Sequence, residues 1–407
     1  MRRRRRRRAP GDHPGAAGGR RRRSPAIERA AAHAFLRAHG AILLGDPDAW
    51  LEAICLAARG TLPAGPRTAV VASPGSWLEA SARAQAGDGD GSGRGVALAA
   101  VAADLEPADV VLIDRAGLGE VPASRAARAL VVPVVARGEL ADDDAGDALV
   151  GLRAALGAVA ACGRAVERIA AGLGPAPREA RAELEIDEPR IQRQLDKLLA
   201  GDRRIGDHEA KVLLAAYGVP VTRQAVATTP SAATRVAKKA GYPVEIRPWG
   251  SDAPSERAGC PVERGISTAA EVRRAFLAVL GAAGLPSAEA DGAAVIVRET
   301  PPAGRELCAT IAQLGPLGWT VWIEVAGAPA PVAAPAPLRL VDAAMLAAAV
   351  TATRAGEPEP DRVALANLLR RATHLAVDQG FERVELGRVI AAPKGARSLV
   401  VDAEIIR

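Results

Sequence analysis

The part of the sequence that most constrains the fold runs from Ile205 to Pro243, where a helix, a tight turn, a short strand and a second helix are expected in that order. Asp207 precedes apolar residues that recur every three to four positions, which is typical of an amphipathic helix with an acidic N-cap. Gly218 ends this helix, and Gly241 ends the next one shortly before Pro243. This order predicts mixed α/β layers.

Composition supports the same fold class. The chain has 407 residues, of which 49% are hydrophobic and only 2% aromatic, so its cores must be built from Ala, Val and Leu. This suits α/β layers better than an aromatic-rich β sandwich, and the length suggests two or three domains.

The net charge of +6 comes from one end of the chain. Residues 1–24 carry eleven arginines against Asp12, a local +10, which leaves −4 for residues 25–407. We expect residues 1–31 to form a disordered Arg-rich tail. If the chain binds nucleic acid at all, we expect this tail to bind it; the positive charge of the tail could also bind an anionic membrane surface. No apolar stretch reaches the ~18 residues of a membrane span, so we expect no membrane partner for the folded part of the chain. The four cysteines are widely spaced and form no Cys-x-x-Cys pair, which favours a reducing, cytoplasmic location.

Between residues 32 and 171 the sequence alternates short apolar runs with helical segments. Fully apolar runs separated by helices favour a parallel sheet covered on both faces, so we predict a flavodoxin-like, doubly wound domain. The loop at 73–76 follows one of these runs, where such folds present backbone N–H groups to anions, although a plain connection is the commoner reading. The expected strands lie at 41–44, 68–72, 109–114 and 130–135.

A Pro-containing, highly charged segment at 172–186 reads as a linker, and a second unit is expected over 187–407. Within it, residues 326–337 alternate Ala and Pro and are expected to form a surface loop. Helices should dominate from 342 to 379, followed by closing strands at 383–391 and 398–406.

The motif order in this second unit resembles that of an ATP-grasp domain, in particular the nucleotide-binding part of the ADP-forming acyl-CoA synthetases. The resemblance rests on residues 205–246, 294–306 and 383–406. It implies an ATP-grasp fold over 187–407, ATP and Mg²⁺ as cofactors, and an acid-thiol ligase reaction of the acetate-CoA ligase type.

The resemblance also implies nucleotide-binding residues. Arg247 stands on the strand where the family has a phosphate-contacting lysine, and a planar guanidinium keeps the charge with a different geometry. Glu299 closes an apolar strand at the family's adenine-binding position, and Glu306 matches a second acidic position. The segment from Gly250 to Gly265 stands where the family has a glycine-rich flap, but it contains Pro261 and lacks the phosphate-accepting histidine.

Glu385 and Asp402 correspond to the family's metal-binding region near the C-terminus. Gly387 replaces an asparagine ligand there and offers no side-chain oxygen, which weakens a Mg²⁺ site. No catalytic residue is identified. We therefore expect either an ATP-dependent ligase that works with a separate CoA-binding subunit, or a non-catalytic nucleotide-binding or scaffolding pseudoenzyme.

Overall fold

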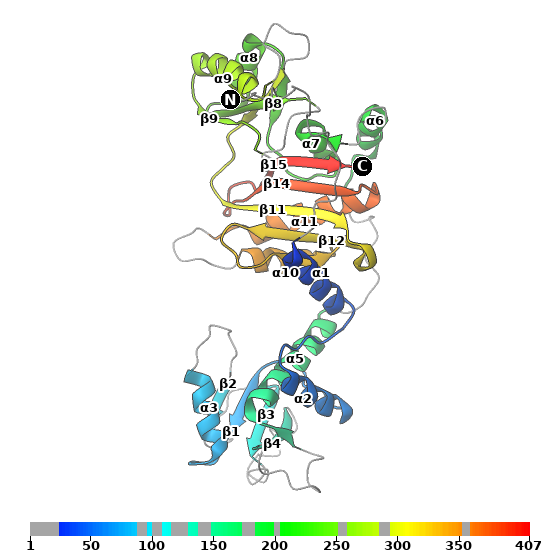
Figure 1. The fold of residues 1–407 in the computed structure, drawn as a ribbon, viewed down its shortest axis with the longest axis vertical. Coiled ribbons are helices and arrows are strands. Elements are labelled where there is room, and N and C mark those ends of the chain that lie inside the picture. Colours follow the sequence, from blue (N-terminus) through cyan, green and yellow to red (C-terminus); the bar gives the residue numbers. More distant parts are fainter. Residues whose placement is uncertain are drawn as a thin grey trace, which may run out of the picture.

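The computed structural model describes residues 24–87, 96–99, 108–114, 129–136, 148–172, 184–198, 204–250, 259–284, 294–351 and 359–407. They form a parallel sheet at one end of an elongated molecule and two antiparallel sheets at the other (Figure 1). Within the described residues, none of the helices combines the length and apolar character needed to cross a bilayer.

The parallel sheet has the strand order β2-β1-β3-β4-β5 and confirms the predicted flavodoxin-like module. Buried, uninterrupted apolar strands form its centre, and α2, α3 and α5 pack against them. The elements are α2 (Pro47–Ala58), β1 (Thr68–Val71), α3 (Trp77–Gly87), β2 (Val96–Ala99), β3 (Val110–Asp114), β4 (Leu130–Val135), β5 (Leu149–Val150) and α5 (Leu152–Ala170).

Two expectations for the N-terminal region were wrong. Residues 25–31 belong to helix α1 (Pro25–Ala38) instead of a disordered tail, and residues 1–23 lie outside the described residues. The apolar residues 41–44 form no strand; they connect α1 to α2, and Ile42 and Leu44 pack partly against the core of the parallel sheet. Their apolar character reflects burial of a connection.

Helix α1 lies on the other unit, against its six-stranded sheet (Figure 1). Ile27 and Ala31 pack there with Leu314 and Trp322 in a small apolar cluster. From α1 on, the chain therefore passes from one unit to the parallel sheet and returns through α5.

The six-stranded antiparallel sheet has the order β13-β12-β11-β14-β15-β6, and α7, α10 and α11 cover one face of it with the largest apolar core of the described residues. Its expected surface loop at 326–337 contains a strand, because residues 332–335 pair with β12. The elements are α6 (Glu188–Leu198), β6 (Arg204–Ile205), α7 (Asp207–Ala216), β11 (Arg305–Gln313), η5 (Gly315–Leu317), β12 (Trp319–Val325), β13 (Val332–Pro335), α10 (Leu340–Val350), α11 (Arg362–Asp378), β14 (Arg383–Ala391) and β15 (Leu399–Ile406).

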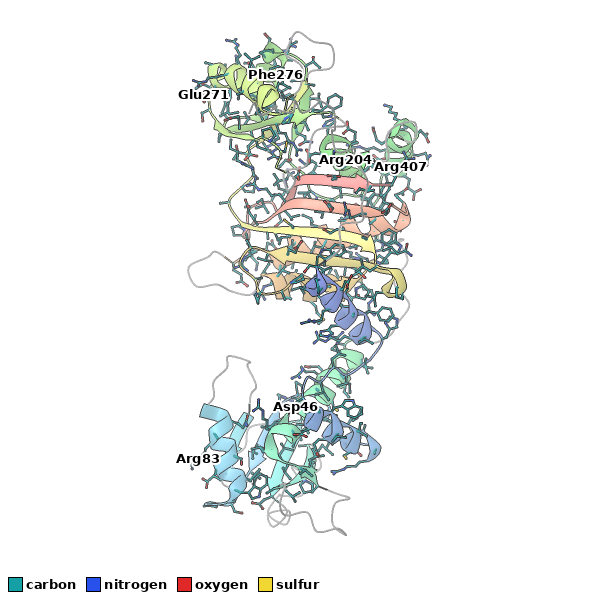
Figure 2. The ribbon with its side chains drawn as sticks, viewed as in Figure 1. Asp46, Arg83, Arg204, Glu271, Phe276 and Arg407 are labelled. Carbon is teal, nitrogen blue, oxygen red and sulfur yellow. The ribbon has the colours of Figure 1, made fainter. Side chains whose placement is uncertain are left out.

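A four-stranded antiparallel sheet, in the order β7-β10-β8-β9, forms a smaller lobe with α8 and α9 on one face. Its apolar core, centred on Phe276, is separate from the core of the six-stranded sheet. Figure 2 shows Phe276 within this lobe and Arg204 near the adjacent edge of the six-stranded sheet. The elements are β7 (Gln224–Ala227), α8 (Pro230–Ala240), β8 (Val244–Trp249), β9 (Glu263–Ile266), α9 (Ala269–Ala282) and β10 (Ala294–Glu299).

Candidate functional site

The two antiparallel sheets meet at a crevice lined by charged side chains. Along β8, Val244 and Ile246 point into the lobe's apolar core, so the alternation of a strand turns Glu245 and Arg247 to the opposite face. Across the ladder, Arg298 on β10 pairs in register with Glu245. The lobe thus presents charges to the six-stranded sheet.

Arg247 points into this crevice, and only 3% of it is exposed. Its Nη1 donates a hydrogen bond to Asp402 on β15 and lies 3.8 Å from Asp207 Oδ2. Burial opposes its charge, but the carboxylates of Asp207 and Asp402 outweigh burial and raise the pKa of Arg247. The cation is therefore permanently charged and already paired.

Asp207 does not cap its helix as expected; Gly206 occupies the N-cap position and Asp207 is the first helical residue. Its buried carboxylate accepts hydrogen bonds from Lys211 Nζ at 3.1 Å, from the backbone N–H of Ala403 at 3.0 Å and from Gln224 Nε2 at 3.2 Å. It ties the first turn of α7 to β15 and β7.

Lys211 is fully enclosed in the same cluster. Its ammonium donates to Thr222 Oγ1 at 3.0 Å, to Gln224 Oε1 at 2.8 Å and to the carbonyl oxygen of Val401. Burial lowers the pKa of Lys211 to about 8, and the nearby Asp207 only partly opposes that shift. The charge of Lys211 is therefore lost at a lower pH than that of an exposed lysine.

Arg298 completes the cluster. Its Nε donates to Glu245 Oε2 at 2.9 Å and its Nη1 donates to the carbonyl oxygen of Val401 at 2.9 Å, so it links the lobe to β15. Three cations and three carboxylates are buried together in what we call the crevice cluster: Asp207, Lys211, Glu245, Arg247, Arg298 and Asp402. The more exposed Arg264 and Arg388 also lie 3.7 and 3.8 Å from Glu245.

Little space remains beside the crevice cluster. A cavity of ≈ 20 Å³ lies between the sheets, lined by Arg247, Pro248, Trp249 and Glu209 among others. The Trp249 indole N–H donates to Glu209 Oε1 at 3.2 Å and bridges the lobe to α7. Nucleotide sites have volumes of roughly 300–1,000 Å³, so this conformation is closed.

The other expected binding residues, Glu299 and Glu306, do not line this cavity. Glu299 accepts hydrogen bonds from the backbone N–H of Arg223 at 2.9 Å, from its Nε at 2.7 Å, and from Arg397 Nη2 at 3.2 Å. Glu306 pairs with Arg388 at 2.6 Å and its side chain is 56% exposed. Both carboxylates face arginines.

The two expected metal ligands are not brought together around an ion site. Asp402 is paired with Arg247, whereas Glu385 lies 3.1 Å from Arg383 Nε. A Cβ added to Gly387 would lie 2.5 Å from Asp402 Oδ2, so the Asp402 carboxylate occupies the space that an asparagine would need. Among the residues that the structure describes, no group of three or more His, Cys, Asp or Glu side chains could hold a metal ion.

The sequence singled out Arg247 for phosphate and Asp402 for a metal ion, and both roles stay predictions. It did not indicate that the two side chains pair with each other, or that the other four members of the crevice cluster join them. Charged residues inside otherwise apolar strands, as at Glu245 and Arg298, were the available signal, together with the four-residue spacing of Asp207 and Lys211. Of the flap expected from Gly250 to Gly265, residues 251–258 lie outside the described residues, and its last residues begin strand β9.

In the 73–76 loop of the parallel sheet, backbone N–H groups are bonded to carboxylates of the protein itself. The Gly75 N–H donates to Glu79 Oε2 at 2.6 Å, and the Ser73 N–H donates to Asp114 Oδ2 at 3.4 Å. The Gly75 hydrogen bond, together with Arg83, holds the pKa of Glu79 below its ordinary value. Carboxylates already take the amides that an anion would use.

Comparison with known proteins identifies the second unit. The sequence profile described as "ATP-grasp domain" matches residues 197–406, half of the chain. No curated protein sequence matches the chain.

Several solved structures are similar to it. A dinucleotide forming acetyl-coenzyme A synthetase 1 of Ca. Korarchaeum cryptofilum is 27% identical, with a TM-score of 0.46, over 52% of this chain and 99% of that chain. A protein of Pyrococcus horikoshii Ot3 is 22% identical, with a TM-score of 0.46, over 54% of this chain and 98% of that one. ATP citrate lyase from Methanothrix soehngenii is 14% identical, with a TM-score of 0.35, over 50% and 51% of the two chains.

Proposed function

We propose that this chain, which belongs to the ATP-grasp family, binds a nucleoside triphosphate between its four-stranded and six-stranded sheets as the nucleotide-binding part of an ADP-forming acyl-CoA synthetase. One observation carries the proposal: Lys211, Arg247 and Arg298 converge, buried, on a single crevice. Each of the three cations is paired with a carboxylate of the crevice cluster, and phosphate oxygens can replace those carboxylates as partners in charge-assisted hydrogen bonds.

The side-chain N–H groups of Lys211, Arg247 and Arg298 suit phosphate oxygens. The cavity beside them is too small for a nucleotide, so the four-stranded lobe has to move before one can bind. The lobe and the six-stranded sheet have separate apolar cores, and charged and polar side chains join them at the crevice cluster. Opening therefore exchanges ion pairs for water or ligand and leaves both cores intact. A phosphate would then replace the carboxylate of Asp402 as the partner of Arg247.

Members of the ATP-grasp family bind ATP with Mg²⁺, but the residues present here do not fit a preformed Mg²⁺ site. Asp402 is engaged by Arg247, and Gly387 supplies no oxygen from its side chain. Because Mg²⁺ prefers six oxygen ligands in an octahedron, one carboxylate alone does not define a site. We assign no step to the metal.

The bound nucleotide supplies the phosphoryl group for acyl phosphate or acyl-CoA interconversion. This chain binds and orients the nucleotide. Arg247 holds the phosphates, and Glu299 lies at the position that we assign to the adenine amino group. Glu306 is paired with Arg388. A separate CoA-binding subunit would supply the acyl acceptor.

Titration calorimetry with ATP, with and without Mg²⁺, tests the proposal. Arg247→Ala should weaken ATP binding by at least about tenfold, because a charge-assisted hydrogen bond is lost. Arg273→Ala on the exposed side of α9 is the matched control and should bind as the parent does. Equal affinity of the parent and Arg247→Ala would contradict the proposed role of Arg247.

A second candidate, a non-catalytic scaffold, is favoured by the internal charge balance of the crevice cluster. In that case Arg247 and Asp402 lock the lobe closed. Absence of heat with ATP in either condition, with an unchanged melting temperature, would support the scaffold. Asp402→Asn separates the two functions further, since freeing Arg247 should tighten ATP binding by about tenfold only if the crevice opens.

A further inference from the structure

A second and larger cavity lies between the parallel-sheet module and the antiparallel unit. It has a volume of ≈ 410 Å³ and is walled by the end of α1 with the segment that follows, the C-terminal half of α5, and Met345 on α10. Arg339 ties the two sides together: its Nη1 donates to the carbonyl oxygen of Gly172 at 3.0 Å, and its Nε pairs with Asp342 at 2.8 Å. Only 7% of Arg339 is exposed, so the junction beside the cavity is a built contact.

The cavity carries an excess of positive charge. Arg37, Arg164 and Arg168 line it, against Glu167. Within the described part of the chain, neither Arg37 nor Arg168 has a carboxylate at ion-pair distance. Burial, and after it the charge of Arg37, lowers the pKa of Arg168, although Asp342 opposes this. Two arginines from different units therefore lie near each other, and in the described residues neither has a carboxylate at ion-pair distance.

An apolar wall adjoins these cations. Ile169 follows Arg168 on α5 and is 56% exposed, while Met345 is 44% exposed, and both line the cavity. Exposed large apolar side chains beside convergent polar groups are typical of sites for small organic ligands.

We propose that this cavity binds a small organic molecule with a phosphate group. The phosphate pairs with Arg37 and Arg168, whose guanidinium forks suit its oxygens, and the apolar part of the ligand covers Ile169 and Met345. The volume lies within the range of roughly 300–1,000 Å³ found for such sites. Because its two arginines come from α1 and α5, the ligand bridges the two units of the molecule.

Phenyl phosphate and inorganic phosphate, titrated into the full chain at low ionic strength, test this site. Phenyl phosphate should bind more tightly than inorganic phosphate, and the double variant Arg37→Gln/Arg168→Gln should weaken it by at least about tenfold. Met345→Ala should reduce the advantage of phenyl phosphate over inorganic phosphate. Arg153→Gln, in the first turn of α5, is the matched control and should bind as the parent does.

Two further readouts keep the result unambiguous. The melting temperature of the double variant without ligand should equal or exceed that of the parent, since the repulsion between the two arginines is removed. Arg247→Ala should bind phenyl phosphate as the parent does, because Arg247 lies in the crevice and not in this cavity. The result therefore tests this site independently of the proposed nucleotide site. Equal binding by the parent and the double variant, or binding lost only in Arg247→Ala, would overturn the proposal.

Discussion

The parallel sheet and the pair of antiparallel sheets differ in how many charged side chains they bury. The strands of the parallel sheet are apolar almost throughout. Among the described residues, the charged side chain buried beside them is that of Glu52 on α2, which accepts a hydrogen bond from the backbone N–H of Val150. At the junction of the antiparallel sheets, six ionisable side chains are buried together. Burying an ion costs several kcal/mol even after relaxation, so apolar residues would join two sheets at least as well. Charge concentrated at one interface therefore supports the ligand site proposed there, whereas the described strands of the parallel sheet bury no such group of charges.

Removing one partner of the crevice cluster should produce the largest effect. Arg298→Met leaves the Glu245 carboxylate buried without its nearest cation, and we expect the free energy of unfolding to fall by about 3–5 kcal/mol. Urea unfolding measures this. Arg273→Met, on the exposed side of α9, should change it by no more than about 0.5 kcal/mol. A loss below about 1 kcal/mol for Arg298→Met would show that water already screens the cluster, and the contrast with the parallel sheet would disappear.

The titration of Lys211 also tests whether the crevice cluster is buried, and we expect a smaller change in the free energy of unfolding. Its pKa of about 8 in the folded chain lies below the ordinary 10.5, so between these values the unfolded chain binds more protons. The free energy of unfolding should therefore rise with pH across this window, by up to about 1.4 kcal/mol per pH unit. Lys211→Met should flatten that rise, whereas Lys238→Met on exposed α8 should not. Identical slopes in the parent and Lys211→Met would mean that Lys211 is not enclosed.

The smallest effect is expected in the parallel-sheet module. Glu79→Gln weakens the acceptor of the Gly75 N–H, so amide hydrogen exchange at Gly75 should become faster while the buried strand residues are unchanged. Inorganic phosphate should not slow this exchange in the parent chain, because Glu79 and Asp114 hold the loop amides. Protection of Gly75 by phosphate would show that the parallel sheet also offers an anion site.

Periodicity gave most of the fold. Apolar runs identified β1, β3 and β4, and the closing strands β14 and β15 follow the predicted ranges within about one residue. It failed at 41–44, because an apolar run cannot indicate whether a neighbouring strand is available to pair with it. It also failed at α1, whose residues 25–31 were assigned to a tail because the adjacent arginines dominate that region.

The candidate site was predictable only in part. Arg247 and Asp402 follow from position within a resemblance, but their mutual ion pair does not, since 155 residues separate them in the chain. Asp207 was taken for a helix cap because acidic residues favour that position, whereas its carboxylate is held by Lys211 and β15.

The sequence by itself determined the fold class, the ranges of several strands and the identity of the charges available for binding, because these depend on local spacing and residue type. The tertiary structure alone decided how those charges are used. Strand alternation turned Glu245, Arg247 and Arg298 toward β15, and the return of the chain through α5 brought Arg168 to face Arg37. Which charges neutralise each other and which face each other unpaired depends on distances between side chains that are remote in sequence, and only the folded chain fixes those distances.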